Sequence, residues 1–213
     1  MAEADATGGE GSAGAATRVT PWLYAVFFVS GFAALVYQIA WQRALFTVVG
    51  INVETVTIVV SAFMLGLGAG ALAGGALSRD PRRPAIAFFA AAEIGIGLFG
   101  FASLPLIDAA GRACDSLPDA ASAALVFALL LFPTVLMGAT LPLLVAHAVR
   151  ADRNVGRAVG ALYGVNTLGS AIAAIAATLL LLGELGISGS VHLAAAANLA
   201  VGAAGLVLWR TGR

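Results

Sequence analysis

Six long apolar runs, separated by short polar connections, constrain this sequence more than any other feature. A helix needs about 20 residues to cross the ~30 Å hydrocarbon core of a bilayer. The runs lie near residues 22–42, 55–77, 85–107, 123–145, 159–182 and 191–208. With 61% hydrophobic and 10% charged residues, the chain has more apolar surface than a soluble protein of its size can bury. The sequence therefore predicts an all-α, polytopic membrane protein with six transmembrane helices.

The two ends of the chain lie outside the predicted spans. Residues 1–20 consist mainly of Ala, Gly, Glu and Asp, and they lack the basic region and the cleavage site of a secretory signal. We expect them to form a disordered tail. Residues 21–209 then form a six-helix transmembrane domain, and residues 210–213 form a short cytoplasmic tail.

The placement of the arginines predicts how the chain is oriented. All eleven basic residues are arginines, and loops rich in basic residues stay in the cytoplasm. If both termini are cytoplasmic, the outer side holds only Arg43 and Arg112. The cytoplasmic side then holds Arg18, Arg79, Arg82, Arg83, Arg150, Arg153, Arg157, Arg210 and Arg213. We therefore expect a multi-pass protein of the bacterial inner membrane with N- and C-termini in the cytoplasm.

Two of the spans carry glycines at four-residue spacing. Residues four apart share one face of a helix, and glycine on that face lets two helices approach closely in lipid. The glycines are Gly66, Gly70 and Gly74 in the second span, and Gly156, Gly160 and Gly164 in the fifth. We expect these two spans to be the close-packing helices.

Polar side chains at membrane depth mark candidate functional sites. Glu93 lies eight residues beyond Ala85, which places it ~12 Å into the membrane at 1.5 Å per residue. Asn166 lies at a similar depth on the fifth span, so the two side chains would face one another, with Tyr163 one turn closer to the cytoplasm. In one interpretation, Glu93 and Asn166 bind a solute or a proton. In the other, a protonated Glu93 donates a hydrogen bond to a neighbouring helix and fixes the packing.

A second polar group stands at the outer end of the first span. Gln38 and Gln42 share one face of the predicted helix. Trp41 lies where an aromatic belt would meet the membrane surface. Arg43 either pairs with Glu54 across the short loop or faces a solute at the outer mouth. Gln38 and Arg43 are therefore further candidates for a binding site.

Other kinds of chemistry find little support in the sequence. The run Gly66–Gly70 has the spacing of a nucleotide-binding loop, but it lies within an apolar span rather than between a strand and a helix. Cys114 is the only cysteine, and the two histidines lie near opposite ends of the predicted bundle. We expect no cofactor, no metal site and no nucleic-acid partner. An enzymatic activity has no visible catalytic group to support it.

The chain resembles the membrane-embedded N-terminal part of the fused major-facilitator/spermidine-synthase-like bacterial proteins. The matching runs occur in order and reach every span but the last. They are SGFAALVYQIAWQRAL (Ser30–Leu45), AFMLGLGAGALAGGALSRD (Ala62–Asp80), AAEIGIGLFG (Ala91–Gly100), FPTVLMGATLPLL (Phe132–Leu144) and GRAVGALYGVNTLGSAIAA (Gly156–Ala174). Arg43, Glu93, Tyr163 and Asn166 match the family, whose members usually carry Glu where this chain has Gln38.

The resemblance implies half of a major-facilitator fold, in which two six-helix halves hold substrate between them. The family's soluble aminopropyltransferase-like domain would follow the sixth span. This sequence contains neither its Gly-rich cofactor loop nor its catalytic Asp, so we expect the membrane part alone, without polyamine synthesis of its own. Two functions follow as expectations. One is a transporter-like module that moves a small, polyamine-like solute, as a homodimer or with a second membrane subunit. The other is a membrane anchor and partner subunit for a separately encoded, soluble synthase-like enzyme.

Overall fold

The computed structural model describes residues 21–50, 53–152 and 154–211, which form helices and no strands. The predicted tail at residues 1–20 lies outside the described residues. The helices are α1 (Pro21–Val48), α2 (Val53–Ser78), α3 (Ala85–Cys114), α4 (Asp119–Asp152), α5 (Val155–Ala176), the π-helical turn η1 (Ala177–Leu181), α6 (Leu182–Glu184) and α7 (Gly186–Thr211). The prediction of an all-α fold is confirmed.

Within the described residues, six helical segments are long and apolar enough to cross a membrane, with α5, η1 and α6 forming one of them. The helices are longer than the apolar runs that predicted them. The fourth run was expected at 123–145, for example, but α4 spans Asp119–Asp152. Hydropathy locates the residues at hydrocarbon depth, whereas a helix continues into the polar layers on either side.

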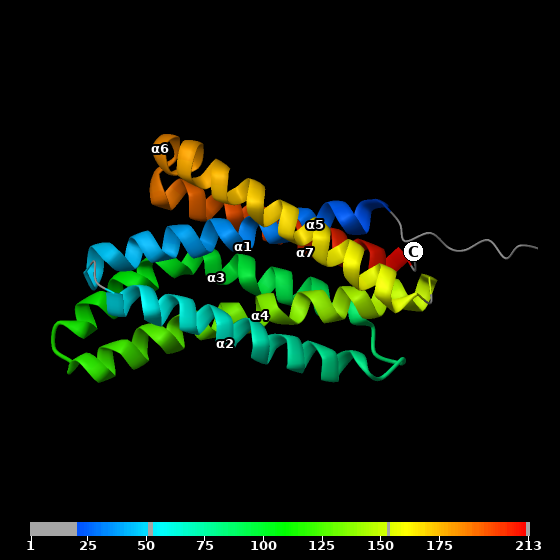
Figure 1. The fold of residues 1–213 in the computed structure, drawn as a ribbon, viewed down its shortest axis with the longest axis horizontal. Helices are drawn as coiled ribbons and strands as arrows, with labels where there is room; N and C mark the ends of the chain where they lie inside the picture. The colour runs from blue at the N-terminus through cyan, green and yellow to red at the C-terminus, as the bar shows by residue number, and fades with distance from the viewer. Residues whose placement is uncertain (1–20, 51–52, 153, 212–213) are drawn as a thin grey trace, which may run out of the picture.

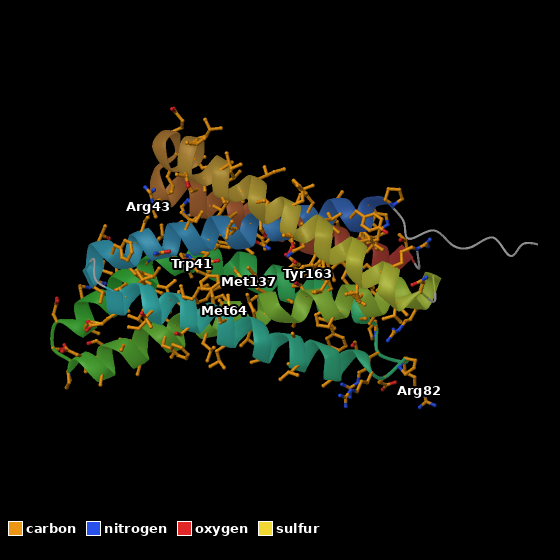
Figure 2. The ribbon with its side chains drawn as sticks, in the orientation of Figure 1. Trp41, Arg43, Met64, Arg82, Met137 and Tyr163 are labelled. Carbon is orange, nitrogen blue, oxygen red and sulfur yellow. The ribbon has the colours of Figure 1, made fainter. Side chains whose placement is uncertain are left out.

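The six spans alternate in direction, so the start of α1 and the end of α7 lie at the same end of the bundle (Figure 1). The loop between α2 and α3 and the junction of α4 with α5 lie at this end too. The arginines described there are Arg79, Arg82, Arg83, Arg150, Arg157 and Arg210. Arg82 and Arg43 mark opposite ends of the molecule in Figure 2. Six of the eight described arginines therefore lie at one end of the bundle, and Arg43 and Arg112 lie at the other.

The arginine-rich loop between α2 and α3 is tied to the end of α4. The Arg150 guanidinium donates hydrogen bonds to the main-chain oxygens of Arg83, at 2.9 Å, and Asp80, at 3.1 Å. Within the loop, the Asp80 carboxylate accepts from the main-chain N–H of Arg82 at 2.9 Å and pairs with Arg83 at 3.6 Å. One guanidinium thus fixes the connection between two spans.

The first three spans make the same main contacts as the last three, when α1 is matched with α4, α2 with α5 and α3 with α7. Helix α2 packs on α4 as α5 packs on α1, and α3 packs on α4 as α7 packs on α1. Helices α3 and α7 pack on each other. Because α1 and α4 run in opposite directions (Figure 1), the two halves are related as an inverted repeat, an arrangement found in many transporters.

The crossing of α2 with α4 depends on two glycines. A β carbon on Gly70 would collide with the main-chain oxygen of Val135, and one on Gly138 would collide with the main-chain oxygen of Leu67. Leu67 and Gly70 are three positions apart on α2, as are Val135 and Gly138 on α4. With no side chain at either glycine, the two backbones are in direct contact.

The crossing of α1 with α5 has the same register. A β carbon on Gly169 of α5 would collide with the main-chain oxygen of Phe28, and one on Gly31 of α1 would collide with that of Asn166. Here too, the residues on each helix are three positions apart. The two crossings are therefore equivalent positions of the inverted repeat.

The glycines singled out from their spacing behave differently in the two spans. Gly66, Gly70 and Gly74 all face α4, where an added β carbon would meet Thr134, Val135 or Ala139. The fifth span corrects the expectation, because its buried face carries Ala158, Leu162, Gly169 and Ala173. The glycines on its opposite, exposed face have no described atom from another helix within 4 Å of a β carbon, and they are Gly156, Gly160 and Gly164.

The C-terminal end of α1 corrects a second expectation. Trp41 is fully buried, stacks on Tyr37 with ring centroids 4.6 Å apart, and donates its Nε1–H to Ser103 Oγ at 2.9 Å. Helix α1 packs against α3, α5 and α7, and Tyr37 and Trp41 near its C-terminal end are fully buried. Trp41 is therefore a core residue, whereas Trp209 remains half exposed.

The turn between the last two spans is at Gly186, between the fifth and sixth predicted spans. Gly186 has a φ of +67°, a left-handed conformation that glycine adopts without steric cost. Residues 188–190, which lie between the fifth and sixth predicted spans, belong to α7. At the other end of α7, Arg210 and Thr211 are still helical, so the predicted tail at 210–213 is helical as far as it is described, and residues 212–213 lie outside the described residues.

Candidate site at the crossing of α3 and α7

Glu93 is fully buried in α3, at the point where this helix meets α1 and α7. Its Oε1 accepts a hydrogen bond from Ser30 Oγ of α1 at 2.6 Å. Its Oε2 accepts one from Asn198 Nδ2 of α7 at 2.5 Å. No arginine of the described chain pairs with it. The carboxyl group therefore joins three helices through two neutral donors.

The contact of α3 with α7 is symmetric about the axis of the inverted repeat. A β carbon on Gly97 of α3 would lie 2.9 Å from the main-chain oxygen of Ala195 in α7. One on Gly202 of α7 would lie 3.0 Å from the main-chain oxygen of Ala90 in α3. Gly97 lies seven residues after Ala90 on α3, and Gly202 lies seven residues after Ala195 on α7. Exchanging the two halves therefore turns one contact into the other. Gly97 and Gly202 are therefore equivalent positions.

Glu93 and Asn198 are also equivalent to each other. Glu93 stands four residues before Gly97, and Asn198 stands four residues before Gly202. Their hydrogen bond thus lies on the axis that relates the two halves. The repeat places a carboxyl on one side of the axis and an amide on the other.

Two buried polar atoms near this contact have no hydrogen-bond partner among the described residues. They are Asn198 Oδ1 and the Tyr37 hydroxyl, on side chains that are 1% and 0% exposed. The Tyr37 hydroxyl lies against Gly100, where a β carbon would collide with it. An unpaired buried polar atom costs about 1–3 kcal/mol. Such atoms in a native fold generally mark a place where water or a ligand binds.

A cavity of about 240 Å³ lies beside the carboxyl, on the axis of the repeat. Most of its polar lining and most of its apolar lining come from different helices. The polar side comes from α1, α5 and α7, with Ser30, Tyr163, Asn166 and Asn198. The apolar side comes mainly from α2 and α4, with Leu67, Ala71, Met137 and Leu141. Met137 and Tyr163 are labelled in Figure 2, near the middle of the length of the bundle.

The two sides of the wall are built from equivalent positions. Ser30 immediately precedes the crossing glycine of α1, and Met137 immediately precedes that of α4. Asn166 and Leu67 are the equivalent residues of the two crossings themselves. The inverted repeat thus supplies one backbone frame with two different linings.

The structure does not join Glu93 to Asn166. Glu93 bonds to Ser30 and Asn198, whereas Asn166 packs against Gly31 of α1. Asn166 and Tyr163 nevertheless line the same cavity as the two partners of Glu93. Tyr163 is 59% exposed. Glu93 thus lies behind the cavity wall and contacts two of its residues, Ser30 and Asn198.

Gln38 and Arg43 lie away from this cavity. Gln38 is half buried, eight residues beyond Ser30 on α1, and its side chain makes no hydrogen bond within the described chain. Arg43 is exposed at the end of the bundle opposite Arg82 (Figure 2). The ion pair of Arg43 with Glu54 is not formed in the described part of the chain.

A second, larger cavity of about 540 Å³ lies at the end of the bundle opposite the arginine-rich loop. It lies among the end of α1 and the starts of α2 and α4, and Glu54 and Asp119 are in its wall. Thr55 Oγ1 donates to the main-chain oxygen of Gly50 there, at 3.1 Å. Both carboxylates are exposed side chains, so this cavity has the character of an acidic mouth.

Reasoning from the sequence missed Ser30 and Asn198, the two partners of Glu93. Asn198 was detectable by depth, because it stands ten residues before Leu208, or ~15 Å along the helix. This is close to the depth found for Glu93. Ser30, eight residues beyond Trp22, reaches the same level. Counting along a helix gives the depth of a side chain but not the direction in which it points.

No known protein family, curated protein or solved structure matches this chain. The function therefore has to be inferred from the geometry of the site. The described residues bring no three His, Cys, Asp or Glu side chains together as a metal site. The cavity can accept a small solute that donates hydrogen bonds, and Glu93 can hold one proton.

Proposed function

We propose that this chain is a transporter-like membrane module that moves a small, polyamine-like solute. The observation that carries the proposal is the cavity on the axis of an inverted repeat, with an intramembrane carboxyl directly behind its polar wall. Transporters built from inverted repeats hold their substrates at the interface between the repeats. A carboxyl at membrane depth is costly, and such groups commonly lie on solute or proton pathways.

The proposal includes a second copy of the chain. A six-helix unit resembles one half of a major-facilitator transporter, and such a transporter binds substrate between two halves. Helices α2 and α5, which flank the cavity, are the least buried of the six spans. Their exposed apolar side chains include Met64, Leu72 and Leu168. A copy seated over this face would complete the enclosure of the cavity.

The orientation also belongs to the proposal. The end of the bundle that carries most of the arginines would face the cytoplasm of a bacterial inner membrane, as the distribution of basic residues favours. Reporter proteins that work in only one compartment, fused to either terminus, test this. Both fusions should report the cytoplasm, and signals from opposite sides of the membrane would contradict the topology.

Uptake into proteoliposomes tests the transport activity. We expect radiolabelled putrescine or spermidine to accumulate in vesicles that contain the protein, and Glu93→Gln to abolish accumulation. Thr47→Val is the matched control, because Thr47 lies outside the cavity wall and its hydroxyl donates only to the main-chain oxygen of Ala44, at 2.7 Å. No uptake of either probe would contradict the proposal, as would equal uptake by the Glu93→Gln variant.

The alternative is a membrane anchor for a separately encoded synthase-like enzyme. The ordered arginine-rich loop favours it, because Arg79, Arg82 and Arg83 form an exposed basic surface next to α4. Purification in mild detergent distinguishes the two functions through the measured mass. A mass of two copies supports the transporter. A synthase-like protein that co-purifies at fixed stoichiometry, together with absent uptake, supports the anchor.

A further inference from the structure

Ser30 and Asn198 both contact Glu93 and both line the cavity. Each donates one hydrogen bond to the carboxyl, and each lines the cavity of about 240 Å³. Their remaining acceptors are the lone pairs of the Ser30 hydroxyl and Asn198 Oδ1, and Asn198 Nδ2 keeps a second N–H. Asn198 Oδ1 has no partner among the described residues. The two side chains therefore connect the carboxyl to whatever occupies the cavity.

The protonation state of Glu93 decides which polar atoms these two side chains offer to the cavity. An ionised carboxylate only accepts hydrogen bonds, so Ser30 and Asn198 must donate to it and keep their oxygens for the cavity. A protonated carboxyl has one proton to donate, and one of the two oxygens must turn to accept it. The hydroxyl turns by rotation, and the amide turns by exchanging its oxygen with its nitrogen. A donor then replaces an acceptor on the cavity wall.

We propose that the cavity binds a small ammonium-type cation in exchange for the proton of Glu93. The cation donates N–H groups to Ser30 and Asn198 while Glu93 is ionised, and the protonated form of Glu93 withdraws one of these two acceptors. This deepens the proposed function and rests on it, because it supplies the substrate class and the coupling ion of that transporter.

For a monovalent cation such as ammonium or methylammonium, the exchange balances in atoms and in charge. The Glu93 O–H bond breaks, its proton leaves to solvent, and one cation enters with its own N–H bonds intact. The site contains one positive charge or one proton at each stage, opposite one carboxyl group. This matters at membrane depth, because an uncompensated buried charge is strongly unfavourable.

The other ionisable groups near Glu93 are few. On α1, Tyr37 interacts with it electrostatically. On α5, Tyr163 lines the cavity. On α7, the exposed His192 stacks on Phe101, with ring centroids 5.4 Å apart. On α4, His147 is half buried toward the arginine-rich end. No described arginine and no second carboxylate contacts Glu93, so it is the group that we expect to titrate as a cation binds.

Proton release on binding tests the inference directly. The native protein in lipid nanodiscs is titrated with ammonium, methylammonium, putrescine and spermidine, with butane-1,4-diol as the uncharged control. Calorimetry in two buffers of different ionisation enthalpy gives the number of protons released. We expect at least one cation to bind with the release of up to one proton. Where Glu93 is protonated before binding, the apparent affinity should fall about tenfold for each unit decrease in pH. The diol should not bind.

Variants separate coupling from simple packing. Glu93→Gln should bind the cation at least tenfold more weakly, at a strength independent of pH and without proton release. Ser30→Ala, a mild change, and Asn198→Leu should each weaken binding, whereas Thr47→Val, at a residue outside the cavity wall, should bind as the native protein does. Binding that is independent of pH in the native protein would overturn the inference. Proton release that persists in Glu93→Gln, or no binding of any of the four cations, would overturn it too.

This test and the transport test fail independently. Cation binding with proton release, but without uptake into vesicles, contradicts the transporter and leaves the exchange site standing. Uptake without proton release supports the transporter and overturns the exchange of a proton for a cation.

Discussion

The two three-helix halves of this molecule share a backbone plan and differ in the side chains around their common axis. The residues at the helix crossings match, with Gly31 equivalent to Gly138 and Gly97 equivalent to Gly202. The residues that surround the cavity do not match. Ser30 of one half is equivalent to Met137 of the other, and Glu93 is equivalent to Asn198.

This difference separates the requirements of folding from those of binding. Close helix contact requires small residues, and both halves satisfy that requirement in the same way. A site on the axis would be chemically symmetric if both halves also kept the same polar residues. The halves instead place a carboxyl opposite an amide and a hydroxyl opposite a thioether, so a solute in the cavity meets one polar wall and one apolar wall.

The largest expected effect on stability comes from replacing Trp41 of α1 by alanine, the residue at the equivalent position of α4. Trp41 lies ten residues beyond Gly31, and its equivalent, Ala148, lies ten residues beyond Gly138. Trp41→Ala removes a large core side chain and the hydrogen bond to Ser103. We expect a loss of about 3–5 kcal/mol of stability, measured as a lower midpoint of thermal unfolding in mild detergent. An unchanged midpoint would show that Trp41 is not packed in the core.

Because the two crossings are equivalent, replacing a glycine by alanine should lower the stability by a similar amount at each. Gly70→Ala and Gly169→Ala each drive a β carbon into a main-chain oxygen, so each should destabilise the fold by about 1–3 kcal/mol. The matched control is Gly160→Ala, where a β carbon meets no described atom within 4 Å. It should be neutral or stabilising by up to about 1 kcal/mol, because alanine is the better helix former. If all three variants unfold at the same temperature, the crossings are misassigned.

The contact on the axis predicts an intermediate effect. Glu93→Leu leaves the hydroxyl of Ser30 and the amide of Asn198 without their shared acceptor, which we expect to cost about 1–3 kcal/mol. Glu93→Gln keeps an acceptor and a similar volume, so its thermal midpoint should stay near that of the native protein. Equal midpoints for Glu93→Leu and the native protein would show that the contact does not stabilise the fold.

The smallest effect is expected where equivalent residues differ but are both exposed. Tyr163 lies three residues before Asn166, and Met64 lies three residues before Leu67; they are 59% and 62% exposed. Tyr163→Met makes the halves alike at this position and should change stability by less than about 0.5 kcal/mol. A larger shift in the midpoint of thermal unfolding would show that the phenol packs against the rest of the protein.

The sequence predicted the fold class and the six spans because apolar length is a local property of the chain. It also pointed to Glu93, since a carboxyl within an apolar run is conspicuous. It did not predict which face of each helix meets which neighbour. Gly70 and Gly160 belong to stripes of the same spacing, but one faces a partner and the other faces outward. Asn198 lies at the depth of Glu93, and only the packing of α3 on α7 brings the two together.

The state of the Glu93 carboxyl during cation binding tests the central claim most directly. Infrared difference spectra of the protein in nanodiscs, recorded at fixed pH before and after a cation is added, report protonated carboxyl groups by their C=O stretch. We expect one protonated-carboxyl band to disappear as the cation binds, and the same experiment on Glu93→Gln to show no such change. A cation that binds while the band persists would contradict the account.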